Sequence, residues 1–243
     1  MPDQQDGIGL GALRRLIGAL LLVASAASAQ AAERRLGLSS FDRVRVEGPF
    51  TVTLAVGRSP GGTVTGDARA VESVEVRQDG ETLVVRAAQM SPSPSPAHDD
   101  RPPLLIALST PSLASGAVVG GGSLGVVGGR GERLDLTVTG PGRITLMGAT
   151  ATELRATVIG GGAAVLAGRA ARARLLLNGA GSITADALEA GDLSVRLDGP
   201  GEVRARARYT AAVSNTGLGH VAVAGAPKCD VRGGGPVQCG VGR

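Results

Sequence analysis

The sequence predicts an all-β chain that folds as a parallel β-solenoid, a stack of coils of about 20 residues each. Three observations predict this class: glycine pairs recur at a nearly constant spacing, aliphatic residues keep a fixed phase around each pair, and the composition is unusual. Aromatic residues make up 1% of the 243-residue chain, which contains 39 glycines and 13 prolines. This composition favours many turns and an aliphatic core over a helical bundle.

The glycine pairs have the form G-x-G, and their first members lie 16 to 20 residues apart. A sharp bend between two strands passes close to the same bend in the coils above and below. Glycine suits this place because it tolerates positive φ and has no side chain to clash. We therefore expect bends at seven pairs: Gly120 and Gly122, Gly140 and Gly142, Gly160 and Gly162, Gly179 and Gly181, Gly199 and Gly201, Gly217 and Gly219, and Gly233 and Gly235.

Aliphatic residues alternate with other residues on both sides of each pair. In one coil the series is Leu134, Leu136 and Val138 before the pair, and Ile144 and Leu146 after it. Such alternation predicts two short strands, each with one face in the core. A single coil buries too little to offset its conformational entropy, so the coils must stack.

One stretch, VVGGGSLGVV, also contains a dinucleotide-binding pattern, G-x-G-x-x-G, at Gly120, Gly122 and Gly125. That motif requires a helix directly after the glycines, and the following VVGGRGERLDL reads as strand and turn. The repeat explains the same glycines better. We therefore expect no cofactor.

The N-terminal 29 residues have the pattern of a signal peptide. Arg14 and Arg15 precede a short apolar run that ends in the small residues Ala27, Ser28 and Ala29. We expect cleavage before Gln30, Sec-type export, and a location in the periplasm, on the cell surface or outside the cell. No later segment is apolar over about 20 residues, so no transmembrane segment is expected in the mature chain.

The mature chain is expected to contain a linker over residues 30–40 and one solenoid domain over residues 41–240. Residues 41–56 alternate like the later coils, with Phe50 in the place of the second glycine. Residues 71–87 predict a hairpin with its turn at Asp79 and Gly80. The proline-rich segment 91–103 predicts an exposed loop, since proline cannot join a central strand.

The two cysteines are expected to form a disulfide. Cys229 and Cys239 both fall at inward positions of the last coil, and an exported protein resides in an oxidising compartment. They lack C-x-x-C spacing, and His98 and His220 are not placed to complete a zinc set. A calcium-binding glycine repeat is also absent, because Arg133 stands where its aspartate ligand belongs, so no metal site is expected.

Several features in a fixed order resemble a known family. They are the opening FDRVRVEGPFTVTL, a hairpin that ends in LVVRA, a P-x-L segment at residues 111–113, and the serial G-x-G coils. From about Phe41 to Cys239, the chain is similar to the head GIN domain family of auto-transporter adhesins. The resemblance implies a right-handed parallel β-helix in the bacterial envelope and an adhesin role. It implies no catalytic residues.

These observations favour an exported, non-enzymatic module that binds or scaffolds an envelope glycan or protein. Nucleic acid is not an expected partner, because the net charge is only +4, the arginines are dispersed and aromatics are scarce. Arg155 and Arg174 occupy the same position on successive coils and are candidates for binding an anion. The alternative interpretation of these two arginines is a solvated charged face.

Two other functions remain open from the sequence. Asp198 and Glu202 flank one bend and would be the acid and base of a polysaccharide lyase or hydrolase, although solvated pairing with Arg196 and Arg204 explains them better. His220 lies outward beside a bend without a matching nucleophile. An outer aliphatic patch of Ile159, Val165 and Leu176 would instead indicate a protein partner.

Overall fold

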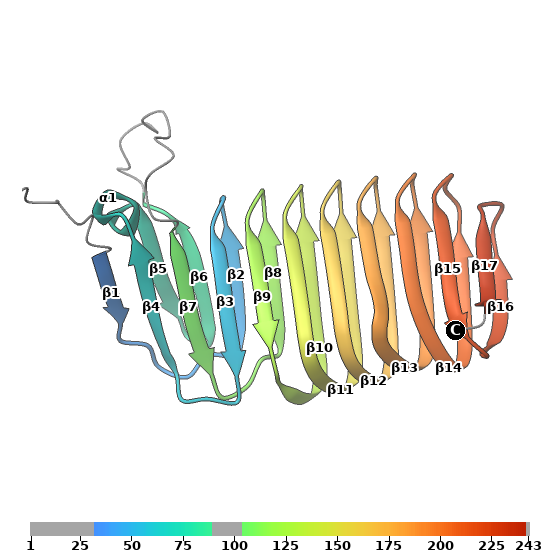
Figure 1. Ribbon diagram of the computed structural model, residues 1–243, viewed down its shortest axis with the longest axis horizontal. Helices are drawn as coiled ribbons and strands as arrows, with labels where there is room; N and C mark the ends of the chain where they lie inside the picture. The colour runs from blue at the N-terminus through green and yellow to red at the C-terminus, as the bar shows by residue number, and fades with distance from the viewer. Residues whose placement is uncertain (1–31, 89–103, 242–243) are drawn as a thin grey trace, which may run out of the picture. The chain divides into compact units, whose positions relative to one another are not determined.

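The computed structural model describes residues 32–88 and 104–241, which belong to one compact unit. The expected signal peptide and proline-rich loop lie outside the described residues. Within them, the chain forms seventeen strands and one short helix (Figure 1). The strands are β1 (Ala32–Leu36), β2 (Arg43–Glu47), β3 (Thr51–Val56), β4 (Gly61–Gly66), β5 (Val74–Asp79), β6 (Thr82–Ala87), β7 (Leu105–Thr110), β8 (Ser115–Val119), β9 (Ser123–Val127), β10 (Arg130–Thr139), β11 (Arg143–Ile159), β12 (Ala163–Asn178), β13 (Ser182–Asp198), β14 (Glu202–Asn215), β15 (His220–Gly225), β16 (Lys228–Arg232) and β17 (Val237–Val241); the helix is α1 (Ala68–Glu72).

The strands stack in two rows of parallel pairs, which confirms the predicted β-solenoid. Row A has the order β6, β2, β8, β10, β11, β12, β13, β14 and β16. Row B has the order β7, β3, β9, β11, β12, β13, β14, β15 and β17. Strands β11 to β14 belong to both rows, because each runs along row B, bends, and continues in row A of the next coil (Figure 1).

The core lies between the two rows and consists almost entirely of aliphatic side chains. The five alternating residues Leu134, Leu136, Val138, Ile144 and Leu146 are all buried, as are their counterparts on the following coils. Their outward neighbours are exposed or half-buried. Side-chain alternation along each strand therefore separates core from surface as the sequence predicts.

The seven glycine pairs lie where the chain turns from row A to row B. At the first glycine of most pairs φ is positive, for example 97° at Gly140 and 105° at Gly160. The second glycine is held against the bend of the preceding coil. A Cβ atom on Gly142 would lie 2.6 Å from the carbonyl oxygen of Gly120 and 2.8 Å from that of Gly122. Only glycine fits such an approach without displacing backbone.

The spatial order of the first coils differs from their order in the chain. The coil formed by β2 and β3 lies between β6 and β7 on one side and β8 and β9 on the other. Phe50 follows this coil's bend, is buried, and packs over Gly48.

Antiparallel strands close the N-terminal end of the stack. β4 pairs antiparallel with β7, and β1 pairs antiparallel with β4. Within the segment 30–40, which the sequence predicts to be a linker, Ala32–Leu36 forms an edge strand. β5 and β6 form the predicted hairpin, with Asp79 opposite Thr82. These strands cover parallel edges that would otherwise be free to pair with another chain.

The C-terminal coil contains the predicted disulfide between Cys229 and Cys239, whose Cα atoms lie 6.4 Å apart. Cys229 is in register with the buried Ala211, and Cys239 with the buried Val223, so both occupy inward positions. Cys229 is nevertheless exposed, because no described strand lies beyond β16 and β17. The bond ties row A to row B where the stack ends.

Removal of this disulfide is expected to loosen the last coil alone. In a Cys229→Ser, Cys239→Ser double variant, the lost cross-link should lower the stability of β16 and β17 by about 3 kcal/mol, the chain-entropy value for so short a loop. Hydrogen exchange should report faster exchange in these two strands and unchanged protection in β11 to β13. Equal loss of protection in both regions would show that the stack unfolds as one unit.

Candidate functional site

A groove lies at the bend opposite the G-x-G pairs, where the chain passes from row B to row A of the next coil. Residues with little or no side chain are aligned there across six coils. In order along the stack they are Gly131, Ala151, Ala170, Ala190, Ala207 and Gly225. Because none of these side chains extends beyond Cβ, the bend is hollowed into a groove of about 890 Å³.

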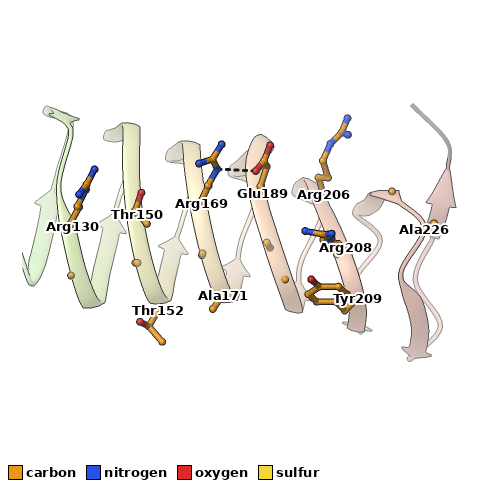
Figure 2. A pocket seen from close by; sticks show the side chains of 17 residues that line it. Arg130, Thr150, Thr152, Arg169, Ala171, Glu189, Arg206, Arg208, Tyr209 and Ala226 are labelled. Atoms are coloured by element: carbon orange, nitrogen blue, oxygen red, sulfur yellow. Dashed lines mark hydrogen bonds and ion pairs between the residues drawn. The ribbon is translucent and has the colours of Figure 1, made fainter.

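Polar side chains form one wall of the groove, one from each of five coils (Figure 2). In order these are Arg130, Thr150, Arg169, Glu189 and Arg206. Arg169 Nε lies 3.1 Å from Glu189 Oε2, and both side chains are largely exposed. Exposed ion pairs of this kind are weak and open readily.

The groove carries an excess of positive charge. Its lining includes four arginines and one glutamate. Among the residues that the structure describes, Arg130, Arg206 and Arg208 form no ion pair, so their charges are available to a ligand. A concave site with unpaired arginines attracts and orients anions.

An exposed aromatic ring lines the groove near one of its ends. Tyr209 is 58% exposed, and the guanidinium carbon of its neighbour Arg208 lies 5.1 Å from the ring centroid. The ring passes close to Gly191, since a Cβ atom there would lie 3.6 Å from Tyr209 Cδ2. Figure 2 shows Tyr209 on the opposite side of the groove from the arginine wall. It offers an apolar platform beside charged donors.

The predicted anion-binding candidates Arg155 and Arg174 do lie together, in register on β11 and β12. They contact the buried carboxylate of Glu153, which sequence analysis did not single out. Arg174 Nη1 lies 3.0 Å and Arg155 Nη2 3.4 Å from Glu153 Oε1, and Arg133 Nη2 donates to Oε2 over 3.2 Å. The role of Arg155 and Arg174 in binding an anion stays a prediction. The carboxylate of Glu153 already neutralises part of their positive charge.

The hydrogen bond from Arg133 holds the pKa of Glu153 below its ordinary value. Burial acts in the opposite direction, while the charges of Arg174 and Arg155 lower this pKa further. Glu153 is therefore ionised at neutral pH and holds together side chains from three successive coils.

Glu153→Gln is expected to destabilise the fold in a pH-dependent way. Because the pKa of Glu153 is lower in the folded state, its carboxylate adds stability above the unfolded pKa, near 4.5, and this stability is lost as the pH falls through the folded value. The urea midpoint of the variant should lie below that of the parent at pH 7 and approach it below pH 4. Glu202→Gln, at an exposed carboxylate paired with Arg204, is the control and should show no such convergence. A gap of constant size at every pH would contradict this assignment.

The residues considered for an enzyme do not meet in the groove. Asp198 ends β13 in row A and Glu202 begins β14 in row B, so they flank the G-x-G bend on the far side of the coil. Glu202 Oε1 pairs with Arg204 Nε at 3.2 Å, and His220 lies beside Glu202 on the next coil. None of the three lines the groove.

The three outer aliphatic residues do not form one patch. Ile159 and Leu176 lie on neighbouring strands of row A, whereas Val165 lies in row B. The expected apolar face for a protein partner is therefore divided between the two sides of the solenoid.

The groove is not among the sites predicted from the sequence, although the sequence contains a signal for it. Arg130, Arg169 and Arg206 recur at separations of 39 and 37 residues, which is close to two coil lengths. The small residues aligned along the floor of the groove recur at one coil length. Alternation around the glycine pairs carries no information on the opposite bend, so it predicts no site there.

The described residues contain neither a cluster of metal ligands nor a membrane-spanning helix. Over residues 32–88 and 104–241, no three His, Cys, Asp or Glu side chains are grouped so that they could hold a metal ion. In the same part of the chain, no helix has the length and apolar character to cross a membrane.

Comparisons with known proteins agree with this architecture. A solved structure of a putative adhesin from Bacteroides fragilis NCTC 9343 aligns with a TM-score of 0.76 at 19% identity, covering 87% of this chain and 97% of that one. A putative lipid binding protein from Parabacteroides distasonis ATCC 8503 aligns at 0.64 and 18% identity, with 87% and 97% covered. A putative adhesin from Parabacteroides merdae ATCC 43184 aligns at 0.62 and 15% identity, with 87% and 96% covered. At these identities the likeness shows the fold.

No curated protein matches the sequence. A family model does match, however: the one described as "Putative auto-transporter adhesin, head GIN domain" covers residues 40–227, which is most of the chain and nearly all of the solenoid. By this match, the chain belongs to the head GIN domain family of putative auto-transporter adhesins.

Proposed function

We propose that this chain is an exported, non-enzymatic module that binds a polymer of the bacterial cell envelope, and that the groove is its binding surface. The observation that carries the proposal is the row of arginines along the groove, of which Arg130 and Arg206 form no ion pair within the described residues. Membership of an adhesin family supports a binding role. The disulfide supports export, because such bonds persist in oxidising compartments.

The lining of the groove favours binding over catalysis. Hydrolysis of a glycoside requires two carboxyl groups placed on either side of the bond. The described lining contains one carboxylate, Glu189, which is paired with Arg169, and it contains no histidine or cysteine. The side chains present can hold a ligand by charge and hydrogen bonds.

The proposal is tested by obstructing the groove in the full chain. Ala171 is exposed and lines the groove, so Ala171→Trp places an indole in the path of a ligand. Ala180 is the matched control: it is also an exposed alanine and lies at the opposite bend of the same coil. Co-sedimentation with isolated cell envelopes should be lost in Ala171→Trp and kept in Ala180→Trp, with no new reducing ends released.

Equal sedimentation of the two variants would refute the groove as the binding surface. If the parent protein releases reducing ends and an Asp198→Asn, Glu202→Gln variant does not, the function would instead be that of a polysaccharide-degrading enzyme.

A further inference from the structure

Resting on the proposed function, we infer that the groove binds an extended acidic polysaccharide with one carboxylate in each disaccharide unit. The wall of the groove is periodic: arginines stand on the first, third and fifth of five successive coils, with Thr150 and Glu189 between them (Figure 2). This pattern of charge, and not the groove alone, specifies the ligand.

The spacing of the arginines matches a disaccharide. Neighbouring strands lie about 4.8 Å apart, so arginines on alternate coils are separated by roughly 10 Å, and the three span roughly 19 Å. Each pyranose of an extended polysaccharide advances the chain by about one strand spacing. A polymer that lies along the stack would thus present a carboxylate to Arg130, Arg169 and Arg206 in turn if every second sugar is acidic.

The residues between the arginines suit the neutral sugars. Thr150 offers a hydroxyl and Glu189 an acceptor, and both can hydrogen-bond sugar hydroxyl groups. Glu189 also repels a polymer that carries a carboxylate on every sugar, which makes it an element of discrimination. The exposed ring of Tyr209 gives a pyranose an apolar surface at one end of the groove.

Other extended polymers fit the groove less well. A peptide that adds a strand needs free backbone groups, whereas the floor residues Ala151, Ala170 and Ala190 lie within paired strands. Single-stranded nucleic acid binds by stacking several bases on aromatic rings, and among the described residues that line the groove Tyr209 is the single aromatic one.

The test compares three hexasaccharides by titration calorimetry at low salt. A hyaluronan hexasaccharide carries one carboxylate per disaccharide, a hexagalacturonate carries one on every sugar, and maltohexaose carries none. We expect the hyaluronan hexasaccharide to bind most tightly. Arg169→Gln should weaken its binding roughly tenfold, the usual effect of losing one charged hydrogen bond. Glu189→Gln should improve the binding of hexagalacturonate relative to the parent protein.

Arg196→Gln is the matched control, because this substitution removes the same charge at a position outside the groove. Arg196 is exposed on row A of β13. The affinity of Arg196→Gln for the hyaluronan hexasaccharide should equal that of the parent, and thermal unfolding should confirm that both glutamine variants are folded. Equal weakening in Arg196→Gln and Arg169→Gln would overturn the inference, because it would indicate unspecific attraction. Tighter binding of hexagalacturonate or of inorganic polyphosphate to the parent protein would overturn it as well.

Envelope binding by Ala171→Trp and binding of the hyaluronan hexasaccharide together separate an error in the ligand class from an error in the proposed function. If Ala171→Trp abolishes envelope binding and the hyaluronan hexasaccharide does not bind, the ligand class is wrong and the groove remains the binding surface. If Ala171→Trp leaves envelope binding intact, the proposed function itself is wrong.

Discussion

Gly162→Ala is expected to lower the free energy of unfolding by about 3 kcal/mol, the upper range for forcing extra volume into a packed site. The added Cβ would lie 2.6 Å from the carbonyl oxygen of Gly142, 2.7 Å from that of Gly140 and 2.6 Å from Val138 Cγ1. Two of these three atoms are backbone, so relief requires the neighbouring coil to move. Equilibrium urea unfolding, followed by circular dichroism, measures the effect.

Gly161→Ala provides the control within the same bend. Gly161 is exposed, its φ is not positive, and apart from its two chain neighbours no described residue has an atom within 4 Å of its Cβ position. This substitution should be neutral or stabilise the fold by a few tenths of a kcal/mol, because it restricts the unfolded chain. Similar losses in both variants would mean that the bend requires glycine for flexibility and not for close approach.

Asn215→Ala is expected to destabilise the C-terminal coils by about 3 kcal/mol, since it removes the side-chain partner of the buried Gly219 carbonyl and of the half-buried Gly217 amide. Asn215 is fully buried at an inward position where the preceding coils have Leu177 and Leu197. Its Nδ2 donates to the carbonyl oxygens of Gly219 at 2.8 Å and Pro236 at 3.0 Å, and its Oδ1 accepts from the amide of Gly217 at 3.1 Å.

The need for this asparagine follows from Pro236. In the preceding coils, the residue after the second glycine donates its amide to the second glycine of the coil before, as from Glu202 to Gly181 and from His220 to Gly201. Pro236 stands in this place in the last coil and has no amide hydrogen. Asn215 supplies the missing donor to Gly219.

A double-mutant cycle tests this compensation. Pro236→Ala restores an amide donor, so it should recover about 1 kcal/mol of the loss caused by Asn215→Ala, as measured by urea unfolding. Asn178→Ala, at an exposed position of the same row, is the control and should change stability by less than about 0.5 kcal/mol. Strict additivity of the two changes would show that Asn215 does not replace the amide of residue 236.

Most of the solenoid could be predicted from the sequence, because side-chain alternation and the glycine requirement of each bend are local properties of the chain. Alternation assigns Leu136 and Val138 to the core whatever lies above them, and the close approach of bends requires glycine at positions such as Gly162. The hairpin at Asp79 and the pairing of Cys229 with Cys239 follow from turn chemistry and coil phase in the same way.

The candidate site was predicted less well, because it depends on neighbours from different coils. Arg155 and Arg174 lie in register, as their shared position in successive coils predicts, but the sequence pattern gave no prediction for the buried Glu153 that contacts both. Its burial follows from the contacts with Arg133, Arg155 and Arg174 on three strands, which no single strand reveals.

The sequence by itself determined the length of the coils, the residues that face the core and the positions of the tight bends. Tertiary structure alone decided that the coil of β2 and β3 lies between β6–β7 and β8–β9, and that Ala170, Arg169 and their counterparts line one groove. The physical reason is that alternation and turn chemistry act within a few residues, whereas coil order and a groove arise from pairing between strands far apart in the chain.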